Sequence, residues 1–82
     1  MSYEKVKQAK HIKVGLKQTI KAINRGEASE VIIAEDADAH IIEQIETACL
    51  HHQVPVVYVD SMRQLGKTCG IEVGAACVAI LN

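Results

Sequence analysis

The chain has 82 residues, 49% of them hydrophobic, and a formal net charge of −1 at pH 7. This length allows one domain, residues 1–82, with one modest core. No apolar run is long enough for a membrane span, and the charged stretch MSYEKVKQAK lacks the apolar centre of a signal peptide. Three cysteines without paired spacing do not make a disulfide framework. We therefore expect a cytoplasmic protein with no membrane partner.

The near-neutral total hides a strong segregation of charge along the sequence. Seven of the nine Lys and Arg residues lie within the first 25 positions, where Glu4 is the only acid. Residues 26–55 contain seven acids and no Lys or Arg. A basic segment of this kind favours a polyanionic partner, because the local patch attracts the partner whatever the total charge is.

The sequence pattern alternates between helices and short strands. Apolar positions at three- and four-residue spacing, together with cap residues, predict helices at 2–9, 16–25, 39–52 and 62–69. Short apolar or β-branched runs predict strands at 11–14, 30–34, 56–59 and 74–81. This order is typical of an α/β layer sandwich. The most continuous apolar runs are expected to be central strands, namely Val31–Ile33, Val56–Val59 and Val78–Ile80.

The predicted helix after Gly15 carries a regular stripe of positive charge. Lys17, Lys21 and Arg25 recur every four residues and therefore share one helix face, with Gln18 beside Lys17. Like charges at this spacing repel one another by about 0.2–0.5 kcal/mol per pair. A partner with several negative charges would remove that cost, whereas a solvated surface face is the plain alternative.

Two other stretches contain reactive side chains without a convincing pattern. Gly66-Lys67-Thr68 matches the end of a phosphate-binding loop, but Ser61 stands where that loop needs its first glycine. Cys49, His51 and His52 are possible metal ligands, but there is no C-x-x-C pair and Cys49 falls on the apolar stripe of its helix. No general acid–base pair is evident. We therefore expect no cofactor, no metal site and no enzymatic activity.

The stretch Gly70–Gly74 joins the last predicted helix to the last strand. Its two glycines have the backbone freedom to let the Ile71 and Val73 side chains project outward from the surface. The pattern alone favours the opposite arrangement, in which both side chains pack into the core. The only aromatic residues are two tyrosines. This is too few for a module that stacks unpaired bases on aromatic platforms.

Two blocks taken together, VGLKQTIKAINRG and VPVVYVDSMRQLGKTCGIEVGAACVAI, resemble the kink-turn RNA-binding family of ribosomal protein seven-Ae, in particular its small bacterial homologues. The similarity extends from about Ala9 to Ile80. It implies a three-layer α-β-α sandwich with a four-stranded mixed sheet, in agreement with the element order. It also implies a non-catalytic monomer that binds a sharply bent RNA stem with tandem sheared G·A pairs, in ribosomal or structured messenger RNA.

The resemblance also implies which residues contact the RNA. They are Gly15, Lys17, Gln18, Lys21, Asp38, Ile42, Arg63, Ile71, Glu72, Val73 and Gly74. Lys17 and Gln18 replace the Asn and Glu of the family's G-x-N-E motif, and Arg63 stands beside Met62, which occupies a lysine position of the family's pocket. The loop after the last helix would cover a flipped-out nucleotide, which reverses the preference for a buried loop.

A second function fits the same fold. The replacement of Asn and Glu by Lys17 and Gln18 favours a ribosome-associated protein-interaction module that has lost specific RNA binding.

Overall fold

Helices and strands alternate along the chain in the expected order. The computed structural model describes residues 2–82. Its elements are α1 (Ser2–Gln8), β1 (Ile12–Val14), α2 (Leu16–Asn24), β2 (Ala28–Ala34), α3 (Ala39–His52), β3 (Val56–Val59), α4 (Met62–Thr68) and β4 (Cys77–Leu81). The last strand begins at Cys77 instead of at Gly74 as predicted.

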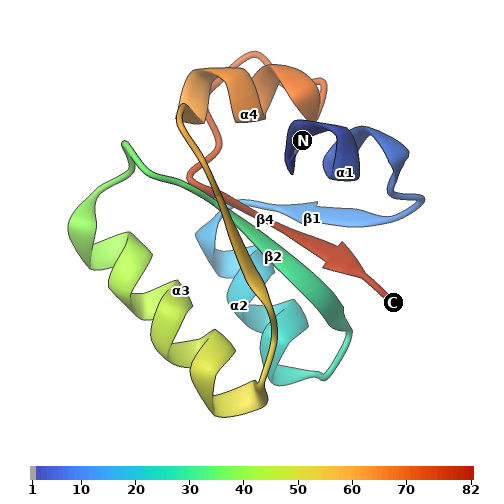
Figure 1. Ribbon diagram of the computed structural model, residues 1–82, viewed down its shortest axis with the longest axis vertical. Helices are drawn as coiled ribbons and strands as arrows, with labels where there is room; N and C mark the ends of the chain where they lie inside the picture. Colours follow the sequence, from blue (N-terminus) through green and yellow to red (C-terminus); the bar gives the residue numbers. More distant parts are fainter. Residues whose placement is uncertain (1) are drawn as a thin grey trace.

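The four strands form one mixed sheet in the order β1-β4-β2-β3. Strand β4 pairs antiparallel with both β1 and β2, whereas β2 pairs parallel with β3. Helices α2 and α3 cover one face of the sheet, and α1 and α4 cover the other (Figure 1). The expectation of a three-layer α-β-α sandwich with a four-stranded mixed sheet is therefore confirmed.

Alternate residues of the strands feed two apolar clusters, one on each face. Val31 and Ile33 of β2 pack beneath α2 and α3 with Ile23 and Ile45. Ile32 lies between them in sequence and points to the opposite face. There it belongs to the cluster that α1 and α4 cover. This period of two is the side-chain alternation of a strand that is buried on both faces.

The prediction that Val56–Val59 is a central strand is wrong. Strand β3 pairs only with β2 and lies at the edge of the sheet, while β4 and β2 occupy the centre. Its residues still contact both helical layers, because Val56 packs against one apolar cluster and Val57 against the other. Burial on both faces therefore explains the apolar run of β3. An apolar run of this kind does not indicate whether a strand lies at the centre or at the edge of the sheet.

Three strands end, and the fourth begins, at the same end of the sheet. Val14 pairs with Val78, and Ala34, the last residue of β2, pairs with Val59. Because α2, α3 and α4 follow these strands directly, all three helices begin there. We call this region the loop end, made up of Gly15 and residues 35–38, 60–61 and 70–76.

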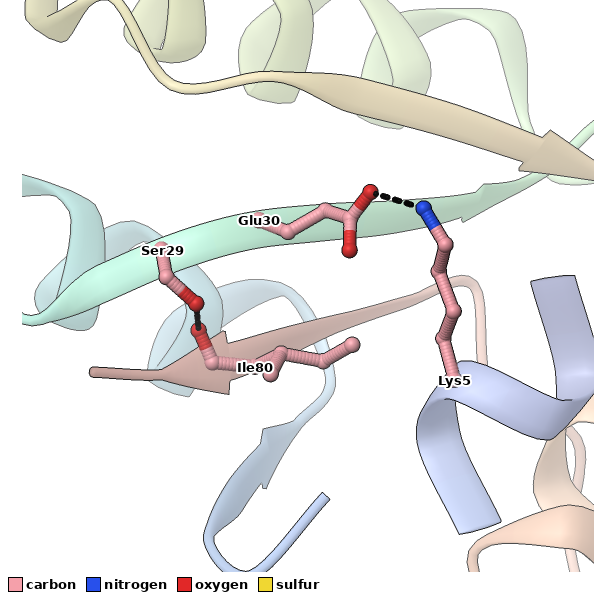
Figure 2. A network of polar contacts seen from close by, with 4 residues as sticks. All are labelled: Lys5, Ser29, Glu30 and Ile80. Atoms are coloured by element: carbon pink, nitrogen blue, oxygen red, sulfur yellow. Dashed lines mark hydrogen bonds and ion pairs between the residues drawn. The ribbon is translucent and has the colours of Figure 1, made fainter. Parts of the chain in front are cut away.

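Two side-chain contacts, shown in Figure 2, connect β2 to its neighbours away from the loop end, one to β4 and one to α1. The β2–β4 register shifts between Ala28 and Glu30, and the Ser29 hydroxyl donates to the Ile80 carbonyl at 3.1 Å. Lys5 Nζ of α1 lies 2.8 Å from Glu30 Oε2. This ion pair leaves Lys5 less free than the other lysines to neutralise a polyanion.

Candidate nucleic-acid interface

The amino end of α2 is the one open helix start at the loop end. Gly15 precedes the helix with φ of 94° and donates its N–H to Cys77 O at 2.9 Å, but it offers no side-chain cap. Side chains cap the other two helices, because Asp38 accepts from His40 N at 2.8 Å and Ser61 from Gln64 N at 3.1 Å. Uncapped N–H groups and the positive end of the helix dipole attract phosphates and other acceptors.

Lys17 lies in the first turn of α2, next to this open start, and Lys21 lies in the last turn of the same helix. Lys17, Gln18 and Lys21 are all exposed, as the sequence pattern predicts for the polar face. Gln18 and Lys21 line a depression of about 160 Å³ together with Lys13, Ala22, Arg25 and Glu27. The set of implied contact residues omitted Lys13 and Arg25. The four-residue stripe contained a signal for Arg25, whereas Lys13 comes from β1, whose position depends on the tertiary fold.

The two apolar side chains of the Ile71–Gly74 segment differ in exposure. Val73 is 71% exposed, while Ile71 is half-buried and packs against the cluster beneath α1 and α4. The expectation from the pattern alone, with both side chains in the core, therefore holds for Ile71 and is wrong for Val73. Glu72 and Gly74 are exposed as well. The segment presents one free apolar side chain at the loop end.

Backbone hydrogen bonds hold the loops of this end together. Ala34 N–H donates to Ala76 O at 2.9 Å, which places the segment before β4 next to the end of β2. Ala75 N–H donates to Met62 O at 3.0 Å, which joins it to the start of α4. With the bond from Gly15 to Cys77, these contacts bring four distant parts of the sequence to one end of the sheet.

The remaining implied contact residues lie in the first turns of α3 and α4 or just before them. The Asp38 carboxylate is exposed and caps α3. Ile42, one turn further on, is half-buried and packs against the cluster beneath α2 and α3. Arg63 is exposed on the first turn of α4, next to Met62, which packs against the other cluster.

The stretches that suggested other chemistry lie in unsuitable places. Gly66-Lys67-Thr68 forms the last turn of α4, whereas a phosphate-binding loop must precede its helix. Cys49 is 2% exposed, and burial raises the pKa of its thiol to about 11. His51 and His52 are exposed at the end of α3. Within residues 2–82 no group of three or more His, Cys, Asp or Glu side chains is placed to hold a metal ion.

A larger hollow lies apart from the implied contact residues. It is an open groove of about 730 Å³ between α2 and α3, lined by Leu16, Ile20, Asn24, His40, Glu43, Gln44, Thr47 and Ala48. None of the implied contact residues lines this groove. The candidate interface is therefore an exposed surface, which suits a macromolecule better than an enclosed small ligand. No helix in the described part of the chain is both long enough and apolar enough to cross a membrane.

Comparisons with known proteins show the family of the chain. Residues 2–82 match the model of the ribosomal protein L7Ae/L30e/S12e/Gadd45 family. The RNA-binding protein YbxF of Geobacillus stearothermophilus is 62% identical over 82 residues, 100% of either chain. An RNA-binding protein of Geobacillus thermodenitrificans is 59% identical with the same coverage. The 15.5kD RNA binding protein of Giardia lamblia has a TM-score of 0.88 and 36% identity over 99% of this chain and 71% of its own.

The chain belongs to the ribosomal protein L7Ae/L30e/S12e/Gadd45 family. The resemblance to ribosomal protein seven-Ae and its small bacterial homologues is thereby confirmed.

Proposed function

We propose that this protein is a non-catalytic RNA-binding protein that recognises kink-turns. The loop end carries the proposal, because it combines the uncapped start of α2 with the exposed Val73 side chain. An anion-attracting helix end and an exposed apolar residue at the same end of the sheet suit a bent RNA that brings phosphates and an unstacked base close together. The relatives named as RNA-binding proteins support the same class of partner.

The division of roles at this surface follows from its chemistry. The first N–H groups of α2 donate hydrogen bonds to phosphate oxygens or base acceptors, and Lys17 and Lys21 neutralise backbone charge that is crowded at the bend. Val73 covers an unstacked base, and Ile71 anchors the same segment to the core. Asp38, Ile42, Arg63 and the Gly15 turn complete the proposed site. Binding the bent form better than the extended form shifts the RNA towards the kink, with no chemical step.

The experiment is a gel-shift titration with a kink-turn stem and with a twin whose G·A pairs are replaced by Watson–Crick pairs. We expect tight binding to the intact stem only. Equal binding to both stems would contradict kink-turn recognition and leave a generic basic patch. Binding to neither would favour the ribosome-associated protein-interaction module, the function for which Lys17 and Gln18 are the support.

The chain offers a matched pair of variants for this test. Val73 and Leu50 are both exposed apolar side chains, at 71% and 80%. Only Val73 lies at the loop end, since Leu50 is close to the far end of α3. Val73→Ala removes about two methyl groups from the base contact and should weaken kink-turn binding about tenfold. Leu50→Ala should leave it unchanged, and an equal effect of the two variants would contradict the proposed site.

We also expect a particular RNA partner, oligomeric state and compartment. The partner is a kink-turn in ribosomal or structured messenger RNA, bound by a monomer in the cytoplasm. The three cysteines are free thiols, which suits a reducing compartment.

A further inference from the structure

The Ile71–Gly74 segment lies along α4 and does not stand free from it. Ile71 N–H donates to Gly66 O at 3.1 Å, and Ala75 N–H donates to Met62 O at 3.0 Å. Met62 and Gly66 are four residues apart and therefore lie on one face of the helix. The segment is thus fastened to α4 at two points that are one helical turn apart.

Gly66 lets the segment come this close. A Cβ atom at Gly66 would lie 2.1 Å from the Val73 carbonyl oxygen, which is closer than real Cβ contacts allow. A Cβ atom at Gly74 would lie 3.2 Å from the Met62 Cβ atom. The close contact with the backbone of α4 therefore fixes how far the Val73 side chain projects from the surface.

The start of α4 is itself held by a residue of the β2–α3 connection. Asp36 Oδ1 accepts a hydrogen bond from Met62 N at 2.8 Å. The carbonyl of the same Met62 accepts the bond from Ala75. The peptide groups of Met62 therefore connect the Asp36 carboxylate to the segment that carries Val73. The nearby Ser61 hydroxyl serves a different group, because it accepts from Gln64 N.

We propose that Asp36 is a positioning residue that holds α4, and through Met62 the Ile71–Gly74 segment, in the arrangement that receives the RNA. The inference rests on the proposed function. A segment that is ordered before binding loses less conformational entropy on binding, so the apparent affinity rises with the population of the ordered form. Asp36 carries a negative charge, so a direct effect on phosphates would be repulsive and would have the opposite sign.

The test uses three variants and two measurements. Asp36→Ala removes the hydrogen-bond acceptor, whereas Asp36→Asn keeps an oxygen acceptor and removes the charge. Glu35→Ala is the matched control, because Glu35 is the neighbouring exposed acid and only its backbone N–H is engaged, with Val59 O. The first measurement is hydrogen exchange of the Ile71 and Ala75 amides in the RNA-free protein. The second is the Kd for the kink-turn stem.

We expect faster exchange of both amides in Asp36→Ala. If the ordered form falls to about a tenth, the Kd rises about tenfold. Asp36→Asn should restore both values, and Glu35→Ala should leave exchange unchanged and bind as tightly as the parent protein or more tightly.

Three results would overturn the inference. They are unchanged amide exchange in Asp36→Ala, whether or not binding weakens, faster exchange in Asp36→Ala with an unchanged Kd, and equal effects of Asp36→Ala and Glu35→Ala. A parent protein that fails to bind the kink-turn stem would contradict the proposed function alone, because the exchange measurement needs no RNA.

Discussion

Asp38 has a structural role that can be separated from a contact with RNA. Its carboxylate accepts from His40 N and caps α3, which leaves the rest of that side chain exposed. The structure accounts for its role as a helix cap, and the resemblance to the family implies its role as an RNA contact. The second role stays a prediction, and it requires a variant that keeps the cap.

We expect Asp38→Ala to lower the free energy of unfolding by about 1 kcal/mol, because it removes the α3 cap. Asp38→Asn should change it by only about 0.3 kcal/mol, since Asn caps helices about as well as Asp. Urea denaturation measures both values. Equal losses in the two variants would show that the charge, not the acceptor, matters. If Asp38→Asn is stable, a change in its RNA affinity reports a contact with RNA.

At the scale of elements, a tyrosine joins the edge strand to α3. The Tyr58 hydroxyl of β3 donates to the Glu46 carboxylate of α3. This hydrogen bond, with burial as a second cause, raises the pKa of Tyr58 to about 12 from 10.0. The folded state therefore holds the phenolic proton more tightly than the unfolded state. The resulting stability is complete below about pH 10 and is lost as the pH rises towards about 12.

Glu46→Gln should lower the pKa of Tyr58 towards 10.0 and flatten the loss of stability in this pH window, because the amide still accepts a bond but carries no charge. Ultraviolet absorbance of tyrosinate measures the titration, in a Tyr3→Phe background where Tyr58 is the only tyrosine. Glu43→Gln on the same helix is the control and should titrate like the background protein. Identical curves for the Glu46 and Glu43 variants would contradict the assigned cause.

Local pattern predicted the elements well and their neighbours less well. Residues 39–52 form a helix with the predicted bounds, because the apolar stripe and the Asp38 cap act within a few turns. The edge position of Val56–Val59 had no local signal, since it depends on which strand the chain places beside β2. The different exposure of Ile71 and Val73 likewise depends on Gly66, whose close approach to Val73 forms only when the segment folds back on α4.

At the scale of the whole molecule, three consecutive strand–helix units bring the candidate site together. Each of β1, β2 and β3 ends at the loop end, so the helix that follows each strand begins there. Gly15, Asp36, Met62 and Val73 thereby come to the same end of the sheet although they lie in different parts of the sequence. No spacing in the sequence could reveal this arrangement. The resemblance to a family indicated it for Gly15, Met62 and Val73, because it supplies the fold, but it did not include Asp36.

The basic residues of the first 25 positions lie on both faces of the folded molecule. The cations of α2 belong to one helical layer, whereas Lys7 is an exposed lysine of α1 in the opposite layer (Figure 1). If RNA lies along α2, only the cations of α2 contact its phosphates and release counterions from them. The salt dependence of binding can therefore assign the RNA to one face without any structure of the complex.

Each phosphate contact that is lost should reduce the slope of log affinity against log salt concentration by about 0.7–0.9. We therefore expect the double variant Lys17→Ala, Lys21→Ala to reduce the slope by about 1.5 for the kink-turn stem. Lys7→Ala removes a like charge from the other layer and should leave the slope unchanged. Gel-shift titrations at several salt concentrations measure it. Equal reductions per lysine on the two faces would show diffuse electrostatic binding, and an unchanged slope in the double variant would remove α2 from the interface.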